Sequence, residues 1–363
     1  MQIALVIYGN LNALTGGYIY DRLLVDYLRA QGHTVNIVSL TRRSYVANMT
    51  DNFSRRLYRY LRRHDCRLLL EDELNHPSLF YLNRRLKQAC GFPIVSIVHQ
   101  VLCRQPLTGC LRFFYRTFER LYFQSVDGFI FNSQSTRAHV ASLVVLRQPS
   151  LVAHPGGDRL GNMLSADGIE SKCFQAGPLK LIFVGNLTPN KEILSLIAGL
   201  ARLPKEIWHL ALVGDLSMDR GYVQKVKALI ARLGLNGQVD MPGPLDGQDL
   251  ARRLTGSHVF VLPFSYEGFG IACLEGMAWG LPVVGSAEGG MKEFVQDGVN
   301  GFLIAREDLP DFAQKIYRLH DQRALLANLG KAALQTFHRQ PAWKDSLRKI
   351  HSFLLTVAEE ANQ

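Results

Sequence analysis

Short apolar runs that alternate with helix-like segments constrain the fold of this chain more than any other feature of its sequence. The runs lie at residues 2–8, 34–40, 66–70, 93–98, 127–132, 150–154, 179–185, 209–214, 258–263 and 282–285. Apolar runs of this length are typical of strands buried on both faces. Because strands that alternate with helices pair in parallel, the pattern predicts an α/β protein with parallel sheets.

The chain is long enough for two such domains, because 363 residues exceed the usual size of one hydrophobic core. Residues 158–177 lose periodicity and are rich in glycine and polar residues, so we place the linker there. We predict one Rossmann-like domain over 1–165 and a second over 166–340. The segment 341–363 is expected to form a separate final helix, around Trp343 to Glu360.

Composition excludes several other classes of protein. Apolar residues make up 47% of the chain and charged residues 20%, without a low-complexity tract, so we expect no disordered arm. The amino terminus lacks the features of a secretory signal, and no apolar run approaches the roughly 18 residues that span a bilayer. The cysteines show no C-x-x-C spacing, which favours reduced thiols. We expect a cytoplasmic protein, soluble or peripheral on the inner face of a membrane.

The most informative segment is SYEGFGIACLEGMAWGLPVVGSAEGGMKEFVQDGVNGF, residues 265–302. A strand is predicted to end at Pro263, and the loop that follows holds Glu267. A helix is predicted to start near Gly270, with Glu275 one to two turns inside it. Backbone N–H groups at the start of a helix suit an anionic phosphate. The predicted donor-binding residues here are Glu267, Gly268, Phe269, Gly270, Ile271 and Glu275.

The pattern E-G-F-G-x-x-x-x-E, followed by A-x-G-x-P-V-V and G-G-x-x-E, resembles the donor-binding signature of glycosyltransferase family 4, the glycosyl transferases group 1. These are retaining enzymes of the GT-B fold, in which two Rossmann-like domains face each other across a cleft. The resemblance implies that the first domain binds the acceptor and the second binds a nucleotide-sugar donor. It also implies that the final helix packs back toward the first domain. The alternative is that Glu267 and Glu275 merely cap and solvate a helix.

The resemblance assigns roles to two residues of VGNLTPNK. Lys191 occupies the position where the family places a lysine on the donor diphosphate, and a cation there stabilises the charge on the departing nucleotide. Asn186 stands where the family usually has an arginine. Because an amide brings no charge, Lys191 and the helix start would have to provide more of the stabilisation.

The resemblance extends to the first domain. Gly16 and Gly17 match the family's glycine pair, where the backbone approaches donor or acceptor closely, although a simple turn explains them equally well. His99 follows a predicted strand and matches the family's histidine near the reacting sugar. Together with Glu267 and Lys191 it forms the predicted catalytic set.

A further strand end carries four polar residues, Glu71, Asp72, Glu73 and His76, where the family binds acceptors. They are predicted to contact an acceptor hydroxyl, with a solvated acidic turn as the alternative. Asp-Glu-x-x-His does not by itself make a metal site, and the sequence has no Asp-x-Asp pair of the kind that anchors a metal-bound nucleotide. We therefore expect neither a metal nor a cofactor, because the nucleotide sugar is a substrate.

The formal charge of +10 is concentrated in the first 170 residues, which hold 20 Lys and Arg against 12 Asp and Glu. Residues 53–64, FSRRLYRYLRRH, form an arginine-rich amphipathic pattern that suits an anionic membrane surface, with an ordinary surface helix as the alternative. Residues 112–123 are so aromatic that we expect them to pack beneath the sheet. No nucleic-acid-binding motif accompanies the charge.

These observations predict a retaining, metal-independent glycosyltransferase of the hexosyl-transferring kind. Its donor would be a UDP- or GDP-sugar, and its acceptor a hydroxyl of a glycan, a lipid-linked molecule or a small molecule, as in the synthesis of cell-envelope polysaccharides. Two alternatives stay open. A nucleotide-sugar epimerase of the same fold would leave the sugar on the nucleotide, and a binding module would retain the fold with little turnover.

Overall fold

The computed structural model describes residues 1–63, 66–105, 109–161, 164–245 and 247–361. The described residues divide into two compact units, each with its own sheet. Unit 1 comprises Met1–Pro155 and Lys344–Gln363, and unit 2 comprises Gly156–Trp343. Residues 156–161, 164 and 165, which we assigned to the first domain on sequence, therefore pack with unit 2. The final helix, although last in the chain, packs with unit 1.

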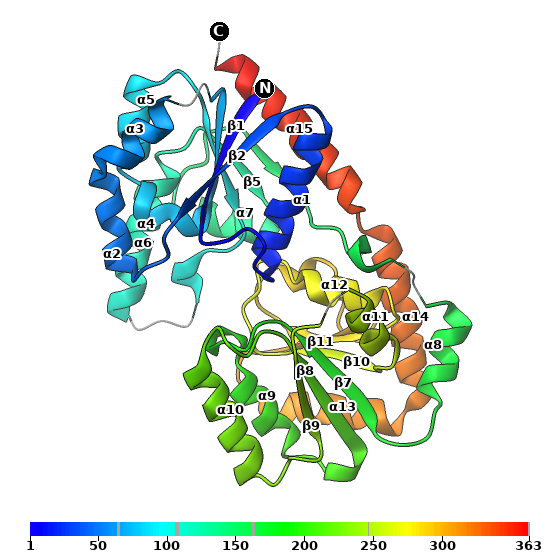
Figure 1. Ribbon diagram of the computed structural model, residues 1–363. Coiled ribbons are helices and arrows are strands. Elements are labelled where there is room, and N and C mark those ends of the chain that lie inside the picture. Colours follow the sequence, from blue (N-terminus) through cyan, green and yellow to red (C-terminus); the bar gives the residue numbers. More distant parts are fainter. Residues whose placement is uncertain (64–65, 106–108, 162–163, 246, 362–363) are drawn as a thin grey trace. The chain divides into compact units, whose positions relative to one another are not determined.

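Unit 1 contains a sheet of six parallel strands in the order β2-β1-β3-β4-β5-β6. The strands are β1 (Gln2–Tyr8), β2 (Thr34–Leu40), β3 (Leu68–Asp72), β4 (Ile94–Val98), β5 (Gly128–Phe131) and β6 (Ser150–Val152). Helices α1 and α15 cover one face and α2 to α6 the other (Figure 1). The helices are α1 (Gly16–Ala30), α2 (Tyr45–Met49), α3 (Arg55–Arg63), α4 (His76–Leu79), α5 (Leu82–Ala89), α6 (Gly109–Phe123), α7 (Gln134–Ala141) and α15 (Trp343–Glu360).

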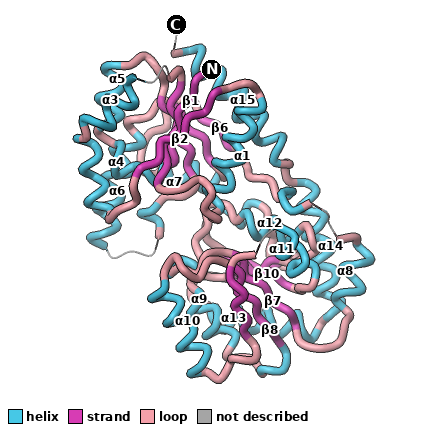
Figure 2. The backbone as a smooth tube through the Cα atoms, in the orientation of Figure 1, coloured by secondary structure: helices cyan, strands magenta, loops and turns pink. Residues whose placement is uncertain are grey.

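Unit 2 repeats the plan with the order β12-β11-β10-β7-β8-β9, again all parallel. Its strands are β7 (Leu179–Val184), β8 (Trp208–Val213), β9 (Val239–Gly243), β10 (Val259–Leu262), β11 (Val283–Ser286) and β12 (Gly301–Ile304). Its helices are α8 (Ala166–Cys173), α9 (Ile193–Leu200), α10 (Arg220–Arg232), α11 (Gly247–Thr255), α12 (Ile271–Met277), α13 (Leu309–Asp321) and α14 (Arg323–Arg339). Figure 2 shows strands and helices alternating along both units.

The strand orders create a reversal point in each sheet. The chain runs from β1 outward to β2 and then returns to β3, so β1 and β3 are neighbours whose following loops diverge. In unit 2 the same relation holds between β7 and β10. Open parallel sheets bind ligands at the carboxyl ends of the strands that flank such a point. The two pairs of loops after these strands are therefore the first places to look for a site.

Two expectations about local structure are wrong. The segment assigned to the linker contains α8, which Ser165 caps by accepting a hydrogen bond from the N–H of Gly168 at 3.2 Å. Ile169 and Cys173 are fully buried in this helix, so burial outweighs its weak helical propensity. Residues 112–123, expected to pack beneath the sheet, form most of α6, which does so only in part: Tyr122 and Phe123 are buried and Tyr115 packs against the core, but Leu111 is 46% and Phe113 73% exposed.

Candidate active site

The loops after β7 and β10 bring Lys191 and Glu267 together at the reversal point of unit 2. Lys191 ends a short 3-10 turn, Pro189–Lys191, and its ammonium group contacts the carboxylate of Glu267. The hydroxyl of Ser265 donates a second hydrogen bond to the same carboxylate oxygen at 2.7 Å. Both charged side chains are about one-fifth exposed, at 20% and 17%. The structure thus places a partly exposed cation and a partly exposed anion side by side at the carboxyl ends of β7 and β10.

Asn186 connects the loop after β7 to the loop after β8. Its side-chain oxygen accepts a hydrogen bond from the N–H of Asp215 at 3.3 Å. The N–H of Leu187 donates to the carbonyl of Asp215 at 3.2 Å, so the two loops are joined at two points. Asn186 therefore fixes the loop that carries Lys191, and as a neutral amide it adds no charge.

The start of α12 lies directly after Glu267 in the chain. Gly270 precedes the helix with φ of +100°, a left-handed conformation that a residue with a Cβ adopts only with strain. Ile271 begins the helix; the N–H of Cys273 donates to the carbonyl of Gly270 at 3.0 Å, whereas Ile271 and Ala272 stand at the helix start, where no preceding turn supplies an acceptor. The side chain of Phe269 is buried in the core, 5.0 Å from the ring of Phe294. The side chain of Phe269 therefore belongs to the core of unit 2.

The second glycine pair of the motif, Gly289 and Gly290, contacts the backbone of the loop that holds Glu267. Gly289 pairs with Glu267 in an isolated parallel bridge, and the N–H of Gly290 donates to the carbonyl of Glu267 at 2.9 Å. A Cβ atom on Gly290 would lie 2.1 Å from the carbonyl oxygen of Gly268. These glycines therefore permit close packing of two backbones.

Glu275 forms an ion pair that the sequence did not reveal. The Nε and Nη2 atoms of Arg159 donate to its two carboxylate oxygens at 2.8 and 3.1 Å. Burial raises the pKa of Glu275, and the neighbouring guanidinium opposes that shift. Because each carboxylate oxygen has two lone pairs, the pair leaves acceptor capacity for a ribose hydroxyl. Arg159 lies in the 3-10 turn Asp158–Leu160, 116 residues before Glu275, and no spacing rule connects the two residues.

At the reversal point of unit 1, Gly17 adjoins His99. Thr15 caps α1 through a hydrogen bond from the N–H of Tyr18 at 3.2 Å, so Gly16 and Gly17 form the first turn of that helix. A Cβ atom on Gly17 would lie 3.1 Å from Cδ2 of His99. The glycine therefore permits the close approach of α1 to the histidine ring.

His99 lies in a cluster of buried acidic side chains. Its Nε2 is 2.9 Å from Oδ1 of Asp21, and its backbone N–H donates to Oε2 of Glu73 at 2.9 Å. Burial raises the pKa of Asp72 to about 6, and burial also raises that of Glu73. Burial, the largest influence, lowers the pKa of His99, but the charge and hydrogen bond of Asp21 together with the charge of Asp72 outweigh it, and the net direction is upward.

Of the four residues predicted to contact an acceptor, the structure brings only Asp72 and Glu73 to His99. Glu71 points to the other face of the sheet, where Oε2 accepts a hydrogen bond from Asn83 at 2.9 Å and burial raises its pKa to about 8. His76 is fully buried between the carbonyl of Glu73 and the hydroxyl of Tyr45, at 2.9 and 2.7 Å. Burial lowers its pKa to about 4, so it serves as a neutral structural bridge.

Asp72, Glu73 and His99 are also the one group of described residues that brings three atoms suited to a metal ion within 4.8 Å of one another. Both oxygens of Glu73 already accept backbone N–H groups, from His99 and from Gln100 at 3.3 Å. Nε2 of His99 is occupied by Asp21. The group is therefore a hydrogen-bonded cluster within the protein.

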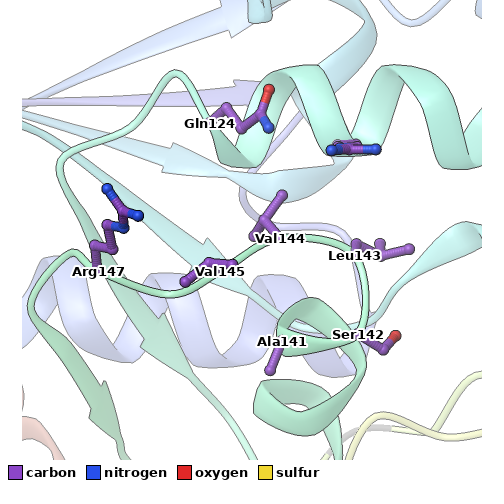
Figure 3. Close-up of a pocket in the computed structure, with 8 residues that line it drawn as sticks. Gln124, Ala141, Ser142, Leu143, Val144, Val145 and Arg147 are labelled. Carbon is purple, nitrogen blue, oxygen red and sulfur yellow. The ribbon is translucent and has the colours of Figure 1, made fainter.

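A hollow of about 410 Å³ lies elsewhere in unit 1, between the end of α6 and the loop after α7 (Figure 3). Gln124 and Arg147 flank the loop that carries Val144 and Val145. None of the predicted site residues lines this hollow. The candidate site therefore lies at the strand ends, where the titratable groups gather.

Comparison with known proteins agrees with this description. Residues 169–336, a little under half of the chain, match the model of the family described as glycosyl transferases group 1. A D-inositol 3-phosphate glycosyltransferase from Arthrobacter sp. strain FB24 is 30% identical over 162 residues, which are 44% of this chain and 38% of that protein. The chain thus spans well under half of that relative's length.

Solved structures match almost the whole chain. Sucrose-phosphate synthase from Thermosynechococcus elongatus superposes with a TM-score of 0.83 at 21% identity, over 98% of each chain. HepE from Anabaena, solved in complex with UDP-glucose, superposes with a TM-score of 0.77 at 19% identity, over 98% of this chain and all of that one. The chain therefore has the α/β fold of the GT-B glycosyltransferases, with two sheets of six parallel strands, and carries within it a segment that matches glycosyl transferases group 1.

Proposed function

We propose that this protein transfers a sugar from a nucleotide-sugar donor to an acceptor hydroxyl, with retention of configuration and without a metal ion. The observation that carries the proposal is the pairing of Lys191 with Glu267 at the reversal point of unit 2, inside the segment that matches glycosyl transferases group 1. A cation at that edge suits a diphosphate, and a carboxylate beside it suits sugar hydroxyls. The diphosphate of the donor would then bind to Lys191, and the sugar hydroxyls of the donor would bind to Glu267.

Unit 2 binds the donor in this proposal. Lys191 and the first-turn N–H groups of α12 hold the diphosphate, Glu267 orients the sugar, and Glu275 accepts the ribose hydroxyls while Arg159 fixes its carboxylate. A UDP-sugar is the first candidate, because HepE has been solved with UDP-glucose. A GDP-sugar is the second.

The proposed reaction forms a bond between C1 of the sugar and the acceptor oxygen as the bond from C1 to the phosphate oxygen breaks. The acceptor proton passes to the leaving phosphate on the same face, which retains the configuration and requires no strong base from the protein. The main contribution of the protein is then electrostatic, because Lys191 stabilises the charge that develops on the leaving diphosphate.

Unit 1 binds the acceptor in this proposal. Asp72 and Glu73 are buried carboxylates beside His99, and one oxygen of Asp72 has no hydrogen-bond partner among the described residues. A buried carboxylate oxygen without a donor is costly, and a hydroxyl group of a ligand would satisfy it. The chemistry suits a hydroxyl of a glycan, a lipid-linked molecule or a small molecule.

We also propose that unit 1 contacts an anionic membrane surface through α3 and α5, which pack together (Figure 1). Five arginines are exposed on them, Arg55, Arg56, Arg59, Arg62 and Arg84. Phe53 is 69% and Tyr81 42% exposed, and their rings lie 5.5 Å apart. We call these seven residues the basic surface. Residue 64, the last of the predicted basic stretch, lies outside the described residues.

Membrane contact of this kind needs no spanning segment. Among the described residues, none of the helices is both long and apolar enough to cross a bilayer. Arginines beside exposed aromatic side chains suit a protein that lies on an anionic surface. A cytoplasmic, peripheral location follows from this proposal.

The donor site is tested by incubating purified protein with UDP-, GDP- and ADP-sugars, with thermal shift to detect binding and mass spectrometry to detect transfer. With the donor that binds, Lys191→Ala and Glu267→Gln are each expected to slow transfer at least about tenfold, or roughly 1.4 kcal/mol of transition-state stabilisation. Lys227→Ala and Glu288→Gln, which change exposed charges of unit 2, are the matched controls and should transfer at the wild-type rate. Near-wild-type rates in both site variants would refute the assignment.

One observation favours a second candidate, a donor-binding module with little turnover. The family's usual arginine is replaced by Asn186, whose side-chain oxygen is occupied by the backbone of Asp215. Binding of a donor without release of free nucleotide or transfer to any acceptor would support this reading. Recovery of the nucleotide with an altered sugar still attached would instead indicate an epimerase.

A further inference from the structure

A side chain that sequence reasoning did not single out holds His99 in place. Asp21 lies in the second turn of α1 and is fully buried, and its Oδ1 is 2.9 Å from Nε2 of His99. Its other oxygen, Oδ2, is buried without a hydrogen-bond partner among the described residues. The carboxylate of Asp21 therefore has the imidazole of His99 as its hydrogen-bond donor.

This contact determines which nitrogen of His99 carries the proton. An ionised carboxylate only accepts hydrogen bonds, so a nitrogen at 2.9 Å from it has to be the donor. Nε2 therefore carries hydrogen in both the neutral and the charged imidazole. Nδ1 has no hydrogen-bond partner among the residues that the structure describes, which leaves it for a ligand.

The imidazole ring of His99 has little room to flip, a movement that would exchange the positions of Nδ1 and Nε2. Gly17 adjoins its Cδ2 atom, and the ring of Tyr20 meets it edge-on with centroids 5.2 Å apart. The backbone of His99 is held on both sides, since its N–H donates to Glu73 and its carbonyl accepts a hydrogen bond from Asn132 at 2.8 Å. A ring with fixed backbone and fixed neighbours presents the same nitrogen to a ligand each time.

We propose that Asp21 is a positioning residue that keeps the proton of His99 on Nε2 and so makes Nδ1 the nitrogen that meets the substrate. The part of this proposal that concerns substrate rests on the proposed function. The part that concerns Asp21 and the proton does not, because it follows from the contact between the two side chains.

The surroundings also favour the charged form of His99. The titratable groups near its ring are Asp21 and Tyr20 from α1, and Asp72 and Glu73 from the end of β3. Burial lowers the pKa of His99, whereas the negative charges of Asp21 and Asp72 raise it, and the net direction is upward. The imidazolium then donates from Nε2 to Asp21 and from Nδ1 to an oxygen of the substrate.

The proton location is tested by NMR on protein labelled with ¹⁵N at histidine, with the His99 signals identified by their absence in His99→Gln. Wild-type protein should show hydrogen on Nε2 of His99 throughout the titration. In Asp21→Asn the pKa of His99 should fall below its ordinary value, because burial is then opposed only by the smaller effect of Asp72. Asp26→Asn, which removes an exposed carboxylate from the same helix, is the matched control and should leave the pKa of His99 unchanged.

Two results would overturn the proposal. One is a neutral wild-type His99 with its hydrogen on Nδ1, a measurement that does not depend on the folding of any variant. The other is a folded Asp21→Asn protein whose His99 titrates as in wild type.

Activity provides the second readout. If the imidazolium is the working form, kcat/KM should decrease as pH rises through the pKa of His99, and in Asp21→Asn this decrease should occur at lower pH. Unchanged pH profiles in a variant that transfers sugar would contradict the role toward substrate. If no donor is turned over at all, the proposed function fails, while the NMR titration still decides the role of Asp21.

Discussion

At the scale of single residues, neighbours in the sequence have different tasks because a strand turns successive side chains to opposite faces. Glu71 and Asp72 follow each other in β3, yet Glu71 bonds to Asn83 on one side while Asp72 adjoins His99 on the other. The sequence showed four polar residues at a strand end, and the structure places them at the end of β3. Which of the four share a site depended on the direction of each side chain.

Glu71 makes stability depend on pH. Its pKa is about 8 in the folded protein and near 4.5 when exposed, so between these values the folded state holds a proton that the unfolded state has lost. Stability should therefore fall as pH rises through this window, by up to about 1.4 kcal/mol per pH unit. Glu71→Gln keeps a neutral group and should flatten this dependence and be more stable than wild type at pH 8.

Urea unfolding at several pH values between 5 and 8 measures this effect. Glu359→Gln, an exposed change on α15 of the same unit, is the control and should follow the wild-type profile. A Glu71→Gln profile parallel to that of wild type would show that Glu71 is ionised in the fold.

The pair of Arg159 and Glu275 gives a second prediction at this scale. Arg159→Gln leaves a buried carboxylate without its cation and should lower the stability of unit 2 by about 1–3 kcal/mol. The double variant Arg159→Gln with Glu275→Gln should recover much of that stability, because no buried charge remains. Donor affinity, measured by calorimetry, should be lower than that of wild type in both the single and the double variant. Full affinity in the double variant would remove Glu275 from the donor site.

At the scale of elements, the site loop of unit 2 depends on contacts between two loops that are far apart in the chain. Glu267 is held by Gly289 and Gly290, and the loop of Lys191 is joined to Asp215 through Asn186. The sequence motif predicted that Glu267 lies in the loop after β10 and that a helix starts near Gly270, and the structure confirms both positions. The role of Gly289 and Gly290 depends on their backbone contact with Glu267 and Gly268, which no local pattern in the sequence shows.

Gly290→Ala tests this contact. Its Cβ atom would lie 2.1 Å from the carbonyl oxygen of Gly268, so the loop has to move or the protein loses about 1–3 kcal/mol of stability. Donor binding should weaken in parallel, because the same loop carries Glu267. Gly237→Ala, where nothing lies within 4 Å, is the matched control in the thermal-shift assay. Wild-type donor affinity in a stable Gly290→Ala protein would contradict the prediction.

At the scale of the whole molecule, the chain builds the same kind of sheet twice and then returns to the first unit. Helix α15 buries Ile350 and Leu354 in unit 1, and Ser346 donates to the carbonyl of His154 at 2.6 Å. Unit 1 therefore needs the end of the chain to complete one face of its sheet. Unit 1 also carries the basic surface, in agreement with the excess of positive charge in the first half of the sequence.

Vesicle sedimentation tests the basic surface. The protein should bind vesicles of anionic phosphatidylglycerol and not those of phosphatidylcholine, and salt should weaken the binding. Each arginine near such a surface contributes about 1 kcal/mol, so Arg55→Gln, Arg56→Gln and Arg59→Gln together should weaken partition roughly a hundredfold. The control replaces Lys225, Lys227 and Arg232 of α10 by Gln. Equal loss in both triple variants, or tighter binding to RNA than to vesicles, would exclude the lipid surface.

The sequence by itself determined most of the buried strands, the alternation with helices and the loop of Glu267, because these depend on periodicity and on residues close together in the chain. It did not indicate the two edge strands of unit 2, namely β9, which is only partly buried, and β12, which is four residues long, or helix α8, whose propensity is weak. Arg159 and Asp21 find their partners across 116 and 78 residues. Only the tertiary structure decided those pairs, because the topology of the sheet, and no local pattern, brings such distant side chains together.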